Sequence, residues 1–357
     1  MGRKRKKRLA FFIKVIFVSV LLIGASTFAV LYNSVYASNV EMKGGDPEYL
    51  YIKSGSEFSD VMDQIKQQNL VVNMTSFEWT AELMNYPAHI YPGKYKIEQG
   101  MSNRQLLTKL RSGQQEQVKI MFGKTRGKRQ LAKYFSDRLE VDFDSLYSMI
   151  TDPDYQKKYG MNSRTISAMF IPNTYFFDWN TSAKQVLDRM IAEYNNFWTK
   201  SRIKKAQKLQ LSKVEVITLA SIVEEETYRN DEKSKIAGVY LNRLRKGRRL
   251  EADPTVRFAV GDFTLKRVLR EHLKIKSPYN TYRVKGLPPG PICIPSIKSI
   301  DAVLSPSQHN YFFFCADAEF TGYHHFSETF DEHRKYARAY QKNLTKQIAI
   351  SKEKAPY

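Results

Sequence analysis

The stretch Ser212-Lys-Val-Glu-Val-Ile-Thr-Leu-Ala-Ser-Ile-Val-Glu-Glu-Glu-Thr227 places three consecutive carboxylates at the end of an apolar segment. Ser212 and Glu215 have the spacing of a capping box, in which a hydroxyl and a carboxylate each bind a free backbone N–H group at the start of a helix. We therefore expect a helix that begins here and carries the glutamates Glu224 to Glu226 at its other end.

The three glutamates point in different directions on such a helix. At about 100° per residue, Glu226 lies within roughly 60° of an apolar stripe made of Leu219, Ile222 and Val223, whereas Glu224 lies on nearly the opposite side. A carboxylate above apolar side chains loses hydration, which raises its pKa and suits it to hold a proton near neutral pH. Glu226 is therefore the candidate general acid. The alternative is an ordinary amphipathic helix with Glu226 at its solvated end.

Composition and charge restrict the class of protein. The chain has 357 residues, of which 42% are hydrophobic and 26% charged, enough for one large domain or two smaller ones. Much of the net charge of +21 comes from residues 1–8, and a second basic cluster spans 243–249. No zinc-finger, helix-turn-helix or aromatic RNA-binding motif accompanies that cluster, so nucleic acid is not the expected partner. A membrane surface or a carboxylate-bearing wall polymer explains the charge as well.

The N-terminal region has the pattern of a membrane anchor. Residues 15–32 contain no charged side chain, and together with residues 11–13 they are long enough to cross a bilayer. We expect a basic cytoplasmic tail at 1–10 and a transmembrane helix at 11–32. A cleavable signal peptide is the alternative, but its apolar region usually has only about 7–15 residues. Six Lys and Arg residues precede the span, so the N-terminus is expected in the cytoplasm and the remaining mass outside.

A polar linker is expected at residues 33–48, and a weak internal repeat follows it. Tyr51–Gly55 and Lys96–Gly100 are followed by apolar residues at the same distances. Each copy predicts a short strand, a glycine turn and an amphipathic helix, the second with a cap at Ser102 and Gln105. Residues 49–116 are thus expected to form a small β/α module that acts either as a spacer or as a glycan-binding unit.

Residues 117–347 are expected to form a larger mixed α+β domain, followed by a tail at 348–357. The predicted helices are Arg126–Leu139, Thr181–Leu209, Lys233–Lys246 and Phe330–Leu344, and the predicted strands are Val118–Phe122 and Tyr311–Ala316. Ile171–Trp179 is an aromatic run broken by proline, so it predicts a loop or edge element whose rings either stack on sugars or pack in the core. Rigid loops of the kind that line a cleft are predicted at Asp253–Thr255, Tyr279–Tyr282 and Gly286–Ile292.

Neither a metal nor a cofactor is expected. Cys293 and Cys315 lack metal-ligand spacing, and they are either joined in a disulfide or are two buried thiols. The histidines do not form a His-Glu-x-x-His motif, and no nucleotide-binding glycine loop is present.

Five motifs occur in an order and at spacings typical of one family: Leu219–Thr227, Val239–Leu244, Leu250–Val256, Tyr279–Tyr282 and Gly286–Ile292. On these motifs the chain resembles the membrane-anchored, YceG-like endolytic murein transglycosylases. The resemblance implies that a glutamate of the Glu-x-Glu-Thr element is catalytic and that the early module is similar to a LysM peptidoglycan-binding domain.

The local pattern Ile-x-x-x-Glu-Thr also resembles the Glu-Ser of the soluble lytic transglycosylases, which implies a lysozyme-like active-site helix and places the catalytic role on Glu226. Glu224 then fills the other family glutamate position as a possible supporting residue. Glu225 departs from the family, whose members often carry a basic residue there. In Gly322–Phe326, either His324 or His325 corresponds to the histidine of the usual Gly-His-x-Phe pattern.

The reaction that this resemblance implies needs one carboxyl group. Glu226 protonates the oxygen of the MurNAc-β-1,4-GlcNAc bond and then, as a carboxylate, removes the proton of the MurNAc C6 hydroxyl, which closes on C1 to leave a 1,6-anhydro-MurNAc end. Asp253 is expected to orient its loop. The residues expected to contact sugars, with turn formation and packing as the alternative, are Tyr279, Asn280, Thr281, Tyr282, Pro288 and Pro289.

The resemblance also implies a location and partners. The chain is expected to be a single-pass protein of the inner (cytoplasmic) membrane, with a periplasmic or extracytoplasmic catalytic domain that cuts nascent glycan strands and so terminates their elongation. Peptidoglycan synthases are the expected partners. Two alternatives stay open: a hydrolase that uses Glu226 with Asp253 or Glu251 as second carboxylate, and a non-catalytic scaffold that holds glycan strands.

Overall fold

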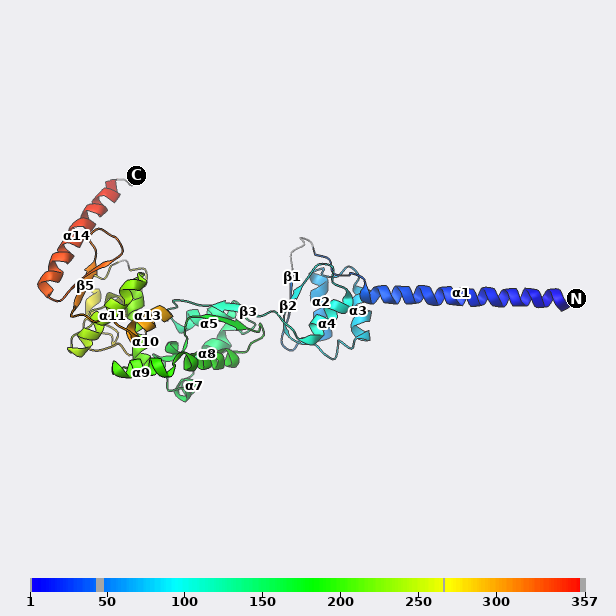
Figure 1. The fold of residues 1–357 in the computed structure, drawn as a ribbon, viewed down its shortest axis with the longest axis horizontal. Helices are drawn as coiled ribbons and strands as arrows, with labels where there is room; N and C mark the ends of the chain where they lie inside the picture. Colours follow the sequence, from blue (N-terminus) through cyan, green and yellow to red (C-terminus); the bar gives the residue numbers. More distant parts are fainter. Residues whose placement is uncertain (1, 43–47, 266, 354–357) are drawn as a thin grey trace. The chain divides into compact units, whose positions relative to one another are not determined.

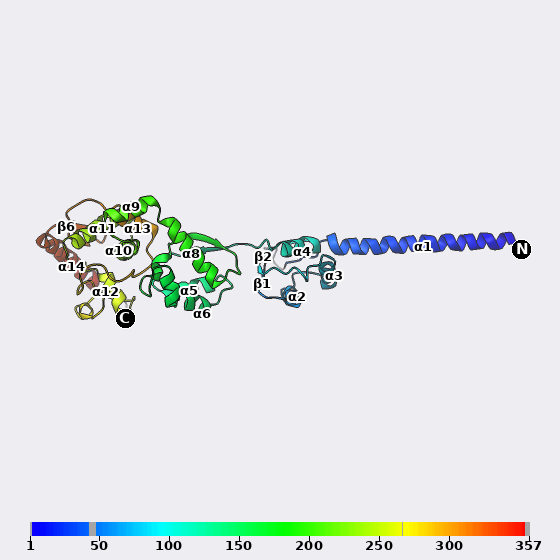
Figure 2. The same cartoon turned by 90° about the horizontal axis from the view of Figure 1, so that it is seen from below.

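The computed structural model describes residues 2–42, 48–265 and 267–353 (Figure 1). Its chain divides into two compact units. The first holds the described residues up to 119 together with 138–140 and 176–181, and the second holds the rest. Helices alternate with short strands, which form two-stranded sheets in the part of the chain described (Figures 1 and 2). This confirms the expected α+β class.

The first unit begins with helix α1, Gly2–Tyr36. Its stretch Arg8–Tyr36 is the one helix of the described residues that is long and apolar enough to cross a membrane. The helix continues past the expected end at residue 32. Thr80 and Asn103 donate hydrogen bonds to the carbonyl group of Ser34, at 3.3 and 2.8 Å, and so satisfy a carbonyl near the helix end.

The expected linker at 33–48 therefore differs from the structure. Its first residues are helical, and Val40 is buried in the core of the following module. Asn39 is also buried, and its side-chain amide donates to Asn103 Oδ1 at 2.7 Å. Residues 43–47 of this segment lie outside the described residues.

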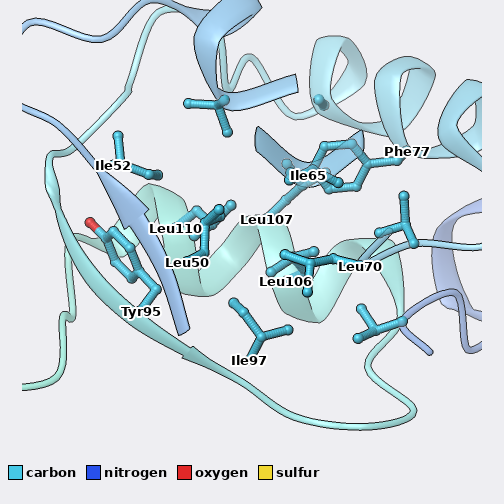
Figure 3. Close-up of a cluster of buried hydrophobic side chains, with 14 of the residues drawn as sticks. Leu50, Ile52, Ile65, Leu70, Phe77, Tyr95, Ile97, Leu106, Leu107 and Leu110 are labelled. Atoms are coloured by element: carbon cyan, nitrogen blue, oxygen red, sulfur yellow. The ribbon is translucent and has the colours of Figure 1, made fainter. Parts of the chain in front are cut away.

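The module contains both copies of the predicted repeat. Strands β1 (Glu48–Ile52) and β2 (Gly93–Ile97) pair antiparallel, with Leu50 opposite Tyr95. Helix α2 (Phe58–Gln67) follows the first strand, and α4 (Asn103–Ser112) follows the second with the predicted cap between Ser102 and Gln105. Helix α3 (Met74–Leu83) lies between the copies and was not predicted. The strands and helices enclose an apolar core of Leu50, Ile52, Ile65, Leu70, Phe77, Tyr95, Ile97, Leu106, Leu107 and Leu110 (Figure 3).

From residue 118 the chain forms β3 (Val118–Met121), α5 (Lys128–Ser136), α6 (Phe143–Thr151), α7 (Pro153–Lys158), a 3₁₀ turn (Ile166–Met169), β4 (Thr174–Phe177), α8 (Ala183–Phe197) and α9 (Lys200–Lys208). The single helix predicted at 181–209 is therefore wrong. Trp198 leaves the helical conformation, and the Thr199 hydroxyl caps α9 by accepting from the backbone N–H of Arg202 at 3.3 Å.

The aromatic run at 171–179 forms β4. Tyr175 and Phe177 are buried, whereas Phe176 is exposed. Its rings therefore divide between the core and the surface.

The remaining elements are α10 (Lys213–Glu226), α11 (Asn230–Arg245), α12 (Asp253–Val260), a 3₁₀ turn (His272–Lys274), α13 (Ile297–Leu304), β5 (Phe313–Ala316), β6 (His324–Ser327) and α14 (Phe330–Glu353). Strands β5 and β6 form an antiparallel hairpin in which Phe314 lies opposite Phe326. Cys293 and Cys315 are free thiols, so the disulfide alternative is not formed.

Helix α10 lies among α11, α12 and α13 (Figures 1 and 2). The predicted capping box is present: the Ser212 N–H donates to Glu215 at 2.8 Å, and the Glu215 N–H donates to Ser212 at 3.2 Å. Every residue from Val216 to Val223 is buried. The helix is therefore surrounded on all sides, and the amphipathic alternative is wrong.

The segment Asp253–Thr255 was predicted to be a loop, but it is the first turn of α12. Pro254 is compatible with this position because the first N–H groups of a helix have no partner within the helix. The turn therefore fixes Asp253 at a helix start.

Candidate active site

The last turn of α10 presents Glu224, Glu225 and Glu226 to three different surroundings. Each carboxylate has its own set of partners, drawn from other elements of the second unit. The three side chains consequently differ in protonation, although they are adjacent in sequence.

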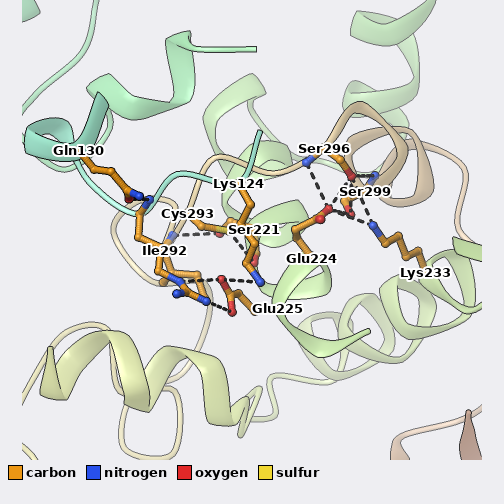
Figure 4. Close-up of polar contacts among 11 residues, drawn as sticks. Lys124, Gln130, Ser221, Glu224, Glu225, Lys233, Ile292, Cys293, Ser296 and Ser299 are labelled. Atoms are coloured by element: carbon orange, nitrogen blue, oxygen red, sulfur yellow. Dashed lines mark hydrogen bonds and ion pairs between the residues drawn. The ribbon is translucent and has the colours of Figure 1, made fainter. Parts of the chain in front are cut away.

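Glu224 is held by donors from α11 and the start of α13 (Figure 4). Its Oε2 accepts from the hydroxyls of Ser296 and Ser299, both at 2.5 Å, and from Lys233 Nζ at 3.0 Å. Burial raises the pKa of Glu224, but these hydrogen bonds outweigh it, so the net pKa is lowered. Glu224 is thus an ionised residue that joins three helices.

Glu225 binds two cations that precede α5. The Arg126 guanidinium donates to both carboxylate oxygens, each at 3.1 Å, and Lys124 Nζ lies 3.0 Å from Oε1 (Figure 4). Burial raises the pKa of Glu225, but the hydrogen bonds and charges of these cations lower it overall. The acidic residue that departs from the family pattern is therefore neutralised locally.

Glu226 is partly buried, and its donor is a tyrosine rather than a cation. The Tyr240 hydroxyl on α11 donates to Glu226 Oε1 at 2.5 Å. Burial raises the pKa of Glu226 to about 7, although the hydrogen bond from Tyr240 acts in the opposite direction; the negative charge of Asp253 adds to the rise. At neutral pH this carboxyl group exists in both protonation states, as a general acid and base requires.

Glu226 faces a cavity of about 420 Å³. The cavity is also lined by Asp253, Glu251 and Tyr282, and the Tyr282 hydroxyl donates to Asp253 Oδ1 at 2.6 Å. Arg243 donates to Glu251 at 2.9 Å. The two carboxylates proposed as second groups of a hydrolase thus share this cavity with the candidate acid.

The structure separates the two histidines of the Gly322–Phe326 motif. His324 lines the cavity, with its Nδ1 2.8 Å from Glu232 Oε2 and its backbone N–H donating to Glu232 Oε1 at 2.9 Å. His325 instead contacts Asp317 at 3.0 Å and stacks on Tyr336. His324 is therefore the one of the pair that accompanies Glu226.

Two of the residues predicted to contact sugars are fully buried. The Asn280 amide donates to the carbonyl groups of Leu273 and Ile275, at 3.0 and 2.9 Å. The Thr281 hydroxyl accepts from the Ala252 N–H at 3.0 Å. Neither side chain has surface left for a sugar: Asn280 ties its loop to residues 273–275, and Thr281 ties the same loop to the residue before α12, which begins at Asp253.

Tyr282 faces the cavity, but the other predicted contacts lie elsewhere. Tyr279 packs on Phe258, with ring centroids 4.7 Å apart, and is not among the described residues that line the Glu226 cavity. Pro288 and Pro289 line a separate pocket of about 540 Å³ with residues from the start of α10. A 14-residue helix is roughly 20 Å long, so this pocket lies at the far end of α10 from Glu226.

The Gly286–Ile292 motif nevertheless has a clear structural contact. The Ile292 N–H donates to Ser221 Oγ at 3.0 Å, in the middle of α10 (Figure 4). The motif therefore fastens a loop to the helix that carries the glutamates.

Sequence reasoning missed Tyr240 and Glu232. The Tyr240 ring is buried, and its hydroxyl donates to Glu226. A buried tyrosine usually has a hydrogen-bond partner, and this rule was the available signal.

Comparisons with known proteins agree with the resemblance. The model of the YceG-like family matches residues 50–339. A Bacillus subtilis (strain 168) protein described as an endolytic murein transglycosylase is 30% identical over 339 residues, which span 90% of this chain and 91% of that protein. A Streptococcus pneumoniae protein (strain D39) with the same description is 25% identical over 298 residues, which span 74% of this chain and 53% of that protein. The crystal structure of a yceG-like protein from Listeria monocytogenes aligns with a TM-score of 0.55 and 26% identity, over 81% of this chain and 98% of that chain.

Proposed function

Because this chain belongs to the YceG-like family, we propose that it is an endolytic murein transglycosylase that uses Glu226 as its acid and base. The observation that supports this assignment most directly is the contrast within one helical turn. Burial raises the pKa of Glu226 to about 7, whereas cationic and hydroxyl donors lower the pKa of its two neighbours. Of the three glutamates, only Glu226, whose pKa is raised, can hold a transferable proton at neutral pH.

In the first step, protonated Glu226 donates its proton to the oxygen of the MurNAc-β-1,4-GlcNAc bond. The bond to C1 of MurNAc breaks, GlcNAc leaves with the proton, and positive charge develops at C1. Tyr240 stabilises the carboxylate that forms, since its hydroxyl already donates to Glu226. Asp253 and Glu251, which line the same cavity, favour the developing positive charge.

In the second step, the Glu226 carboxylate accepts the proton of the MurNAc C6 hydroxyl. The freed oxygen forms a bond to C1 and closes the 1,6-anhydro ring. Glu226 is again protonated, and no water is consumed, so the step balances without a second reactant.

We assign the parts of the chain to this reaction as follows. Residues 117–347 carry catalysis, with 348–357 as a C-terminal tail, and the module of 49–116 holds glycan in the manner of a LysM domain. The helix predicted at 11–32 anchors the chain in the cytoplasmic membrane, with the tail of 1–10 inside and the catalytic domain outside. This arrangement suits an enzyme that terminates nascent strands beside peptidoglycan synthases.

A hydrolase is the second candidate, and a specific observation favours it. Asp253 and Glu251 line the cavity of Glu226, so either carboxylate is placed to activate a water molecule. The product distinguishes the two reactions, because hydrolysis adds one water to the released end.

The test uses the full chain in detergent, as wild type and as Glu226→Gln, with uncross-linked nascent glycan strands. Mass spectrometry of the released ends should show anhydro-muramic ends from the wild type and none from the variant. Glu225→Gln is the matched control, because it removes a neighbouring carboxylate that faces Lys124 and Arg126, and it should still cleave. Cleavage by Glu226→Gln would refute the assignment and make Glu224→Gln the next variant. Ends heavier by one water would identify the hydrolase, and binding without cleavage by the wild type would favour a scaffold.

A further inference from the structure

A second, smaller cavity adjoins the one that contains the candidate acid. It has a volume of about 270 Å³ and shares Glu226, Ala316 and His324 with the larger cavity of about 420 Å³. The carboxyl group thus lies where the two cavities meet. An enzyme that cuts inside a polymer must accommodate chain on both sides of the broken bond, so two cavities that meet at the acid are the expected geometry.

Exposed aromatic rings surround the smaller cavity. Tyr228 is 93% exposed, and Phe320 and Tyr323 remain 38% and 39% exposed, although large rings are normally buried. Grouped exposed apolar rings beside a polar pocket are typical of a ligand site. Here the polar groups are Glu226, Asp317 and His324, so the lining combines flat apolar faces with hydrogen-bonding groups, as a sugar ring requires.

The loop that carries two of these rings is fixed in place. It connects β5 to β6 through residues 317–323, and the Asp317 N–H donates to the Tyr323 carbonyl at 2.9 Å. The Thr321 hydroxyl donates to Asp317 Oδ2 at 2.7 Å. The exposed rings therefore lie on an ordered turn rather than on a loose segment.

Two neighbouring elements support the same loop. Arg229, which follows α10, donates to the Thr321 carbonyl at 2.8 Å and lies 4.4 Å above the centroid of the Tyr323 ring. On α14, Asn343 donates to the Ala318 carbonyl at 3.0 Å. These contacts hold the loop that carries Phe320 and Tyr323 in place before any ligand arrives, which lowers the entropy lost on binding to these two rings.

We propose that the smaller cavity is a sugar subsite, which binds one N-acetylhexosamine residue on one side of the cleaved bond by stacking against Tyr228 and Tyr323. The inference rests on the proposed function, because the ligand is the glycan strand itself. Pockets for drug-sized ligands occupy about 300–1,000 Å³, so the smaller cavity suits a single ring and the larger one suits more of the chain. Glu226 and His324, shared by both cavities, then lie at the bond between the two subsites.

The test separates binding from cleavage. Tyr228→Ala and Tyr323→Ala are each expected to raise the KM for glycan strands by about three- to tenfold, with the pH dependence of kcat unchanged, because each removes a stacking face and no proton-transfer group. Phe176→Ala is the matched control: it removes another exposed ring, on β4, which lines neither cavity, and it should leave KM unchanged.

Affinity is measured independently in the Glu226→Gln background of the full chain by calorimetry with peptide-free GlcNAc–MurNAc strands. Adding Tyr228→Ala or Tyr323→Ala should weaken binding by the same three- to tenfold. Affinities within twofold of the parent for both variants would overturn the subsite. If the wild type fails to cleave, the proposed reaction fails, but the calorimetric comparison still decides whether the strand occupies this cavity.

Discussion

Glu226→Gln is expected to stabilise the folded chain increasingly as the pH rises. The unperturbed pKa of the carboxyl group is 4.5, and burial raises it to about 7 in the folded state. Between these values the folded state binds a proton that the unfolded state has released, so the free energy of unfolding of the wild type falls as the pH rises. This loss is absent below pH 4.5 and complete above pH 7.

The magnitude follows from the same two values. Each pKa unit corresponds to 1.36 kcal/mol, so the charged form of Glu226 destabilises the wild type by at most about 3 kcal/mol at pH 8. Glutamine does not titrate and escapes this loss. The free energy of unfolding of the variant, relative to the wild type, should therefore increase by about 3 kcal/mol between pH 4 and pH 8.

The assay is urea unfolding of the full chain in detergent at pH 4, 6 and 8. Fluorescence of Trp198 reports on the second unit once the other two tryptophans are replaced by phenylalanine. Glu225→Gln is the contrasting control. The pKa of Glu225 is lowered, so its stabilisation is present above pH 4.5 and lost as the pH falls through its folded pKa. The quantity to compare is the free energy of unfolding of Glu226→Gln minus that of the wild type. A value that stays constant or shrinks from pH 4 to pH 8 would refute the raised pKa of Glu226.

Three further changes test the surroundings of the site. Tyr240→Phe removes the hydroxyl that stabilises the charged form of Glu226, so the alkaline limb of kcat/KM against pH should move up by about one to two pH units. Lys233→Met leaves Glu224 without its buried cation and should lower the free energy of unfolding by about 3–5 kcal/mol in urea. Gly238→Ala places a Cβ atom 2.5 Å from a histidine nitrogen and 2.7 Å from a backbone oxygen, so it should lower the unfolding free energy by about 1–3 kcal/mol.

Each of these changes has a matched control. Tyr282→Phe deletes a hydroxyl in the same cavity that donates to Asp253 rather than to Glu226, and the alkaline limb should stay in place. Lys246→Met removes an exposed lysine at the end of α11, and Gly123→Ala adds a Cβ atom where no atom lies within 4 Å. Equal effects in a variant and its control would contradict the contact assigned to that variant.

Local spacing predicted the part of the site that depends on near neighbours. The cap of α10 joins residues three apart, and the apolar positions that precede Glu226 lie within two turns of it, so both could be recognised in the sequence. The hydrogen-bond and ion-pair partners of the three glutamates could not be recognised in this way. Arg126 and Glu225 are separated by 99 positions, and only the folded chain brings them together.

The wrong predictions also concern features that depend on the folded chain and not on local sequence. The prediction of one helix at 181–209 missed the break after Phe197, because a single hydroxyl contact of Thr199 starts α9. Asn280 and Thr281 are polar, and the sequence does not reveal that all of their hydrogen bonds go to the protein interior. Whether a polar residue serves a ligand or a loop depends on burial, which local pattern does not encode.

The junction between α1 and its module has a mechanical consequence. Arg104 donates to the Tyr36 hydroxyl at 2.5 Å. Asn103 and Thr80 donate to the Ser34 carbonyl. The end of the helix is therefore attached rigidly to the module. In a bilayer, such a joint would keep the angle between the helix and the module fixed. A tilt or rotation of helix α1 would therefore be transmitted to the module.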